Sequence, residues 1–279
     1  MMNQKVALVT GSSSGFGLLI TLALAKAGFH VVATMRDLAR KNQLLEKAEA
    51  SGVLEQIECA ALDVTDPDSI YETVTDTLNK HGTIDILVNN AGFAAGGFIE
   101  EVPMETWRRQ FETNVFGLID VTKAVLPSMR EAGSGTIINM SSISGRIALP
   151  GLGPYSASKF AIEGFSEALR LEMQPYGVHV VLIEPGSYQT AIWSKGLDAL
   201  EHQELSDYAS KTARLMKRVR RIAETAGDPE DVAKLVADVA ELDRPDFRYP
   251  IGKGVKQTVN LKHWLPWKWI ERTILKKMS

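Results

Sequence analysis

Residues 5–34 constrain the fold of this chain more than any other stretch. Residues 5–10 (KVALVT) are a short apolar run of the kind that forms a buried strand. A glycine-rich turn over 11–17 follows, then an apolar helix that ends at Gly28, then a second buried strand over 29–34. A strand, a helix and a second strand in so short a stretch predict a βαβ unit, in which the two strands lie parallel.

The glycine-rich turn predicts a site for a phosphate group. Gly11, Gly15 and Gly17 allow the backbone to turn tightly and to approach a ligand closely. The helix after the turn directs its first amides and the positive end of its dipole toward the same place. A strand, a glycine-rich turn and a helix in this order indicate a site for the pyrophosphate of a dinucleotide.

The rest of the chain alternates between strands and helices. Further strands are expected near 55–61, 84–89, 135–141 and 178–184, and helices near 38–50, 67–81, 104–131 and 155–175. Pro127 is expected to bend or end the helix over 104–131. This order predicts an α/β fold, with one doubly wound parallel sheet in a single domain over 1–279. Ligands bind at the carboxyl ends of such strands, where Gly11, Asn90, Ser142 and Pro185 are all expected to lie.

Tyr155 and Lys159 are four residues apart in a predicted helix, so their side chains share one face. A phenol alone is a poor acid or base near neutral pH, because its ordinary pKa is roughly 10. A fixed ammonium beside it favours the phenolate and lowers that pKa, so the phenol can protonate a carbonyl oxygen or accept a proton from an alcohol. Ser142, at the end of a predicted strand, is placed to hydrogen-bond the same oxygen.

Several motifs, taken in chain order, resemble those of the classical short-chain dehydrogenase/reductase family. They are the TGxxxGxG turn over 10–17, Asp63 in ALDVTD, the NNAG run over 89–92, Asn114 in FETNVFG, the trio Ser142, Tyr155 and Lys159, and Pro185 and Gly186 followed by Thr190. The resemblance covers residues 5 to about 190. It implies a Rossmann fold and the transfer of a hydride between a nicotinamide cofactor and a carbonyl or a secondary alcohol.

The resemblance also implies a role for each matching residue. Tyr155 is expected to be the acid/base, and Lys159 to lower its pKa and hold the nicotinamide ribose. Ser142 is expected to orient the substrate oxygen, so that Ser142 and Tyr155 bind the substrate. Asn114 is expected to hold a water in a proton relay, unless it is an ordinary helix asparagine bonded to the backbone. The expected cofactor contacts are Gly11, Ser13, Ser14, Gly15, Phe16, Gly17, Arg36, Asp63, Val64, Asn90, Ala91, Gly92, Tyr155, Lys159, Pro185, Gly186 and Thr190.

The end of the second strand favours NADP(H) over NAD(H). Enzymes that prefer NAD carry an acidic residue there to accept a hydrogen bond from the ribose 2′-hydroxyl, and this chain has Met35. The next residue, Arg36, can pair with a 2′-phosphate through charge-assisted hydrogen bonds. The alternative is that Arg36 points into solvent or pairs with Asp37. Many NADP-preferring relatives carry a second basic residue where this chain has Ser14.

Other features make several classes of function improbable. The net charge of −3 gives no general attraction to nucleic acid. Five histidines, at 30, 81, 179, 202 and 263, lack ligand spacing, so neither a metal site nor a Ser-His-Asp triad is expected. Cys59, on an apolar strand, is expected to be a buried structural thiol, and Asp85, Ser141 and Glu163 are expected to be structural. No stretch is apolar enough to cross a membrane, and a cytoplasmic location is expected.

Residues 187–227 match the position of the substrate lid in the family. Trp193, Leu197 and Leu200 are its candidate apolar contacts with a substrate. Lys217, Arg218, Arg220 and Arg221 follow in a predicted helix, and such a cluster is usually a solvated face rather than a nucleic-acid site.

The tail over 264–279 contains three of the five tryptophans. If it is helical from Pro266, Trp267, Ile270, Ile274 and Met278 share one stripe. Three interpretations stay open: packing over the substrate pocket or a second subunit, peripheral contact with a membrane, or a loose end. Apolar residues in the lid and the tail favour a bulky hydrophobic substrate, such as a ketone of steroid or retinoid type.

The sequence therefore predicts an NADP(H)-dependent oxidoreductase, a carbonyl reductase or alcohol dehydrogenase with Tyr155 as acid/base. The alternative is a catalytically silent protein that binds NADP(H) as a sensor or scaffold. The retention of Asn114, Ser142, Tyr155 and Lys159 favours the enzyme. A homo-dimer or homo-tetramer is expected by analogy with the family, through the helices that carry Asn114 and Tyr155.

Overall fold

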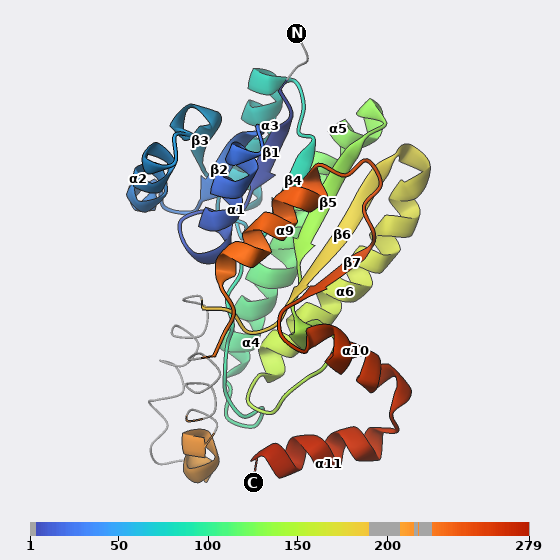
Figure 1. Cartoon of the computed structure of the whole chain (residues 1–279). Coiled ribbons are helices and arrows are strands. Elements are labelled where there is room, and N and C mark those ends of the chain that lie inside the picture. The colour runs from blue at the N-terminus through green and yellow to red at the C-terminus, as the bar shows by residue number, and fades with distance from the viewer. Residues whose placement is uncertain (1–3, 190–206, 215–216, 218–224, 279) are drawn as a thin grey trace.

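The computed structural model describes residues 4–189, 207–214, 217 and 225–278. Within them, seven parallel strands form one sheet in the order β3-β2-β1-β4-β5-β6-β7 (Figure 1). The strands are β1 (Val6–Val9), β2 (His30–Met35), β3 (Ile57–Ala61), β4 (Ile86–Asn89), β5 (Gly135–Met140), β6 (Val178–Pro185) and β7 (Arg248–Ile251). The strand order reverses between β1 and β4, and ligands of doubly wound sheets bind at such a reversal.

Helices cover both faces of the sheet (Figure 1). They are α1 (Gly15–Lys26), α2 (Asn42–Ala50), α3 (Pro67–His81), α4 (Met104–Phe111), α5 (Gly117–Ala132), α6 (Gly153–Met173), α9 (Pro229–Ala240), α10 (Val255–Trp264) and α11 (Trp267–Met278), with short turns η1 (Leu38–Arg40), η2 (Leu54–Gln56), η3 (Glu112–Phe116), η4 (Ile143–Gly145) and η5 (Gln174–Tyr176). One core cluster joins α1, α2 and α9 to the sheet, and the other joins α3, α5 and α6.

The alternation of side chains along each strand explains why both faces are apolar. In β1, Ala7 and Val9 belong to the α1 and α9 core, whereas Leu8 between them belongs to the α3 and α5 core. A parallel strand with helices on both sides has no face left for water, so its sequence is an unbroken apolar run. The predicted doubly wound α/β fold is confirmed.

Three sequence expectations differ from the structure. The expected helix over 104–131 is divided by the π-helical turn η3, and Pro127 lies within α5 without ending it. A proline removes one backbone donor, and α5 continues for five residues beyond it to Ala132. Cys59 is half-buried rather than buried, because β3 is an edge strand. The elements β7, α9 and α10 were not among those expected from the sequence. Within the described ranges, no helix combines the length and apolar composition that crossing a bilayer requires.

Candidate active site

The glycine-rich turn packs so closely that two of its glycines have no room for a side chain. A Cβ on Gly17 would lie 2.2 Å from the carbonyl oxygen of Gly11 and 2.4 Å from Nδ2 of Asn90. Gly11 also has φ of +72°, in the left-handed region, and a Cβ there would lie 2.9 Å from Cα of Ala91. The motif therefore holds the turn against the end of β4 and leaves its backbone open for a ligand.

The start of α1 fits a pyrophosphate. Ser14 is the N-cap residue, yet its side chain does not cap the helix, and the first turn of α1 contains no acidic residue. Its first amides and the positive end of its dipole are thus left for an anion. Phe16 lies at the edge of this turn, with its ring 5.8 Å from the ring of Tyr188.

Asn90 braces the glycine-rich turn. Its side-chain amide donates to the carbonyl oxygens of Thr10 (2.9 Å) and Gly11 (3.2 Å). In return, Oγ1 of Thr10 accepts from the backbone amides of Asn90 and Ala91, both at 3.0 Å. The ends of β1 and β4 are locked together by these four bonds. Gly92 follows, and a Cβ on it would lie 3.0 Å from Oδ1 of Asn114.

The end of β2 carries the residues expected beside the adenosine. The residue there is Met35, which is buried and has no acidic group to accept a hydrogen bond from a ribose hydroxyl. The side chain of Arg36 is 77% exposed, and its Nε lies 4.0 Å from Oδ2 of Asp63. The other oxygen of Asp63 accepts from the amide (3.0 Å) and hydroxyl (2.8 Å) of Thr65. The ion pair that the structure shows for Arg36 is therefore with Asp63, whereas Asp37 caps η1.

Ser142, Tyr155 and Lys159 come together, buried, where β5 ends and α6 begins. The hydroxyl of Ser142 forms a hydrogen bond with the Tyr155 phenol and also accepts from the amide of Ser144 at 3.0 Å. Nζ of Lys159 lies 5.7 Å from the centre of the Tyr155 ring and donates to the carbonyl oxygen of Met140 at 2.7 Å. Tyr155 and Lys159 therefore lie on one face of α6, as their spacing predicted.

The electrostatics of this group differ from the expectation. Burial raises the pKa of Tyr155, and the hydrogen bond with Ser142 opposes that rise only in part. Burial also lowers the pKa of Lys159 to about 8, although the negative charge of Glu163 acts to raise it. The expected net lowering of the Tyr155 pKa is not seen, because the burial of the phenol outweighs the effects that favour the phenolate. The phenol is therefore fully protonated near neutral pH.

Asn114 lies in the middle of the π-helical turn η3 and is buried. Its side-chain oxygen accepts from the amide of Phe93 (3.1 Å), and its nitrogen donates to the carbonyl oxygen of Phe93 (2.9 Å). A further bond of 3.4 Å joins it to Oγ of Ser158, one residue before Lys159. The side chain thus bonds to backbone, as the alternative interpretation expected. Isolated π-helical turns are frequent at functional sites.

Comparison with known proteins identifies this arrangement. A family model described as short chain dehydrogenase matches residues 5–202. The chain belongs to the short-chain dehydrogenase family. It is 48% identical to the uncharacterized oxidoreductase YusZ of Bacillus subtilis over 99% of each chain. It is 34% identical to a 3-ketodihydrosphingosine reductase of Bacteroides thetaiotaomicron, over 95% of this chain and 94% of that relative.

Solved structures of short-chain dehydrogenases share the whole fold. One from Streptomyces avermitilis is 32% identical, with a TM-score of 0.80, and the match covers 98% of this chain and 99% of that chain. A family member from Burkholderia phymatum in complex with NAD is 26% identical (TM-score 0.80; 94% and 95% covered). A metagenomic family member in complex with NADP is 28% identical (TM-score 0.70; 88% and 96% covered). These relatives support a nicotinamide cofactor. Because one of them holds NAD and another NADP, they do not show which of the two this chain prefers.

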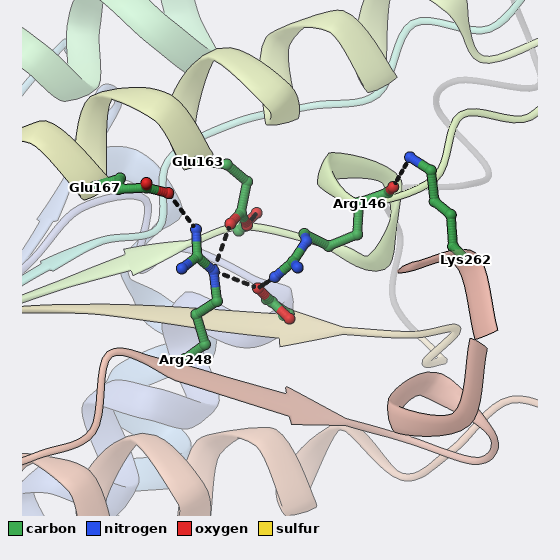
Figure 2. Close-up of polar contacts among 7 residues, drawn as sticks. Arg146, Glu163, Glu167, Arg248 and Lys262 are labelled. Carbon is green, nitrogen blue, oxygen red and sulfur yellow. Dashed lines mark hydrogen bonds and ion pairs between the residues drawn. The ribbon is translucent and has the colours of Figure 1, made fainter. Parts of the chain in front are cut away.

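An ion-pair network joins α6 to β6 and β7 (Figure 2). Arg248 of β7 places Nε 3.2 Å from Glu163 and 3.3 Å from Glu184, and its NH2 nitrogen 3.1 Å from Glu167. Glu184 is 1% exposed and also pairs with Arg146 at 2.8 Å. Glu163 accepts from the hydroxyl of Ser141. These contacts fit the structural role expected for Ser141 and Glu163, and the charge of Glu163 also acts on Lys159.

The remaining expected residues lie at the edge of the site or outside the described residues. Pro185 ends β6, and the amide of Gly186 donates to the carbonyl oxygen of Ile251 at 2.9 Å. Thr190, most of the lid, and the basic residues at 218, 220 and 221 lie outside the described part of the chain. Of the described lid residues, Tyr208 stacks on Phe98 with ring centres 4.8 Å apart and donates to Glu100 at 2.6 Å.

Proposed function

We propose that the chain is an NADPH-dependent carbonyl reductase, with Tyr155 as the proton donor. The observation that supports this most is the buried group of Ser142, Tyr155 and Lys159, at the same sheet edge as the glycine-rich turn. A bound reduced nicotinamide supplies the hydride that the carbonyl carbon accepts. Gly11 and Gly17, with the first turn of α1, would hold its pyrophosphate.

The residues of the chain provide the proton chemistry. As the carbonyl carbon gains a hydride, negative charge develops on its oxygen, and hydrogen bonds from Ser142 and Tyr155 stabilise that charge. Tyr155 then gives its proton to the oxygen. The raised pKa of Tyr155 keeps that proton in place near neutral pH, which suits reduction better than oxidation. The Lys159 ammonium, 5.7 Å from the phenol ring, favours the phenolate that remains.

We infer that the substrate is a bulky hydrophobic ketone. The similarity to a 3-ketodihydrosphingosine reductase along nearly the whole chain supports this class, as do the exposed tryptophans of the tail. A screen of NADPH oxidation across ketones with long acyl chains, steroids, retinoids and short oxo-esters tests it. Preference for short polar oxo-acids would contradict the inference. A purified chain that binds NADPH but reduces none of these substrates would favour the silent sensor or scaffold instead.

Glu163→Gln should move the alkaline limb of the activity profile to lower pH. The Glu163 carboxylate favours the charged form of Lys159, so its loss allows the ammonium to deprotonate below the pKa of about 8 that it has in the native chain. The expected shift in the pH dependence of kcat is roughly one unit, at the low end of what an opposite charge at short range produces.

The matched control for that variant is Glu167→Gln. Glu167 pairs with the same Arg248 but lies one helical turn farther from Lys159, and its side chain is 63% exposed. It should leave the profile of activity against pH unchanged. Equal profiles for both variants and the native chain, at equal melting temperatures, would show that Glu163 has a structural role alone.

We also propose that the corner between α10 and α11 contacts an anionic membrane surface. Trp264, Trp267 and Trp269 are 81%, 59% and 68% exposed, and Leu261 and Leu265 beside them are also exposed. Residues 261–278 contain five Lys or Arg and a single acid, a balance that attracts anionic lipids. Figure 1 shows α10 and α11 beyond the carboxyl ends of the strands, on the side of the active site. A hydrophobic substrate could then enter from the lipid.

The tryptophans of α11 allow a direct test. The native chain should co-sediment with phosphatidylglycerol vesicles and not with phosphatidylcholine vesicles, and Trp267→Ser with Trp269→Ser should abolish the binding. Tyr71→Ser, which removes an aromatic side chain of 70% exposure from α3, is the control. Light scattering on each variant gives the oligomeric state. A change of assembly without any vesicle binding would assign this corner to a second subunit.

A homo-dimer or homo-tetramer through η3 and α6 is proposed from analogy with the family. Phe116 and Phe160 are 49% and 42% exposed on these two elements, which suits burial against a second copy. The same light-scattering measurement tests this, and a monomer would contradict it. The cytoplasmic location stays a prediction.

A further inference from the structure

Two histidines and a glutamate meet at the amino ends of β2 and β3. The candidate active site lies at the other end of the sheet, where the strands have their carboxyl ends. His30 begins β2, and Val32 pairs with Glu58 in β3. Since side chains alternate along a strand, His30, Val32 and Glu58 point to the same face. This is the α3 face, because Val31 and Ala33 belong to the core on the other side. His81 is the last residue of α3.

The donor atoms of the three side chains converge. Nε2 of His81 lies 3.2 Å from Oε2 of Glu58, and Nε2 of His30 lies 3.6 Å from the same oxygen. One donor from each residue can be chosen so that all lie within 4.8 Å of one another. In the described structure, Nε2 of His30 is buried and forms no hydrogen bond. Imidazole nitrogens and carboxylate oxygens are the ligands that Zn(II) takes, together with thiolates.

We propose that His30, Glu58 and His81 form a binding site for a divalent transition metal of the Zn(II) type. Zn–ligand bonds of about 2.0–2.2 Å in a tetrahedron place neighbouring donors about 3.3 Å apart, close to the distances between Glu58 and each histidine. A water completes the fourth position. The metal links the end of α3 to the strands β2 and β3.

The carboxylate of Glu58 is held in place by a neighbouring lysine. Nζ of Lys80 donates to Oε1 of Glu58 at 2.8 Å, which fixes the carboxylate and leaves Oε2 for the metal. The sequence pattern did not predict this site because the three residues come from separate elements.

Zinc titration of the full chain, without a histidine tag and after treatment with a chelator, tests the proposal. Isothermal calorimetry should show one Zn(II) per chain, and His30→Gln and His81→Gln should each weaken binding at least about tenfold. His179→Gln, which changes a histidine of β6, is the matched control and should bind like the native chain. Co(II) in place of Zn(II) should give the visible absorption of a tetrahedral site in the native chain and in His179→Gln, and not in His30→Gln or His81→Gln.

Circular dichroism shows whether each variant is folded, and Glu58→Gln provides a third donor variant if a histidine variant is not. No stoichiometric uptake by the native chain would overturn the proposal. So would uptake that is equal in the native chain and in every folded variant of the three residues. None of these measurements depends on enzymatic activity, so failure of the metal site and failure of the proposed reductase are separate results.

Discussion

Tyr155→Phe should reduce kcat for NADPH-dependent ketone reduction by roughly 10³-fold, within the range that a positioned proton donor contributes. The change removes one hydroxyl from a buried phenol and keeps the ring against which Lys159 lies at 5.7 Å. The hydrogen bond to Ser142 is lost as well, while the bond that the amide of Ser144 donates to that serine remains. A bound cofactor would still supply the hydride, but the phenol that we propose as the proton donor to the oxygen would be gone.

Affinity for NADPH distinguishes a chemical effect from a damaged site. Tyr155→Phe should bind NADPH as the native chain does, in a fluorescence titration, and should melt within a few degrees of it. Tyr176→Phe removes the same hydroxyl from a ring that is 49% exposed in η5, the turn after α6, and should retain full activity. A Tyr155→Phe enzyme with native turnover would refute Tyr155 as the acid.

Elements whose pattern is local were predictable from the sequence. The helix expected over 67–81 is observed as Pro67–His81, with Asp66 capping its start and Gly82 ending it. The strand β7 was missed, because Arg248 and Tyr249 give it no apolar run and its place is fixed by pairing with β6. The π-helical turn was missed as well, since an extra residue in a helical turn has no signature in composition.

In the candidate site too, the features that depend on neighbouring residues were predictable, and the contacts between distant segments were not. The glycine motif and the spacing of Tyr155 and Lys159 depend on neighbouring residues, so their geometry followed from the sequence. The bonds of Asn90 to Thr10 and the pairing of Glu163 with Arg248 join residues far apart in the chain. A pattern confined to one segment does not encode them. The effect of burial on the pKa of Lys159 was missed for that reason, because the burial comes from the packing of whole elements.

Arg36 decides the cofactor preference in the proposed function, and its replacement should have the second large effect. Met35 is buried and gives the ribose no acidic partner, so the exposed guanidinium of Arg36 is the group placed to meet a 2′-phosphate. Hydrogen bonds to charged groups contribute about 1.5–3 kcal/mol each. Arg36→Ala should therefore raise KM for NADPH by roughly 10- to 100-fold and leave KM for NADH nearly unchanged, as steady-state kinetics with both cofactors can measure.

Arg36→Asp should go further and invert the preference. An aspartate there repels a 2′-phosphate, together with Asp63, which lies 4.0 Å from Arg36 in the native chain. The same aspartate can accept a hydrogen bond from the 2′-hydroxyl of NADH. Arg40→Asp makes the same change of charge in the neighbouring turn η1 and should alter both affinities little. If Arg36→Asp and Arg40→Asp weakened NADPH equally, the general charge of this edge would explain the effect; if Arg36→Ala weakened NADH as much as NADPH, Arg36 would not read the phosphate.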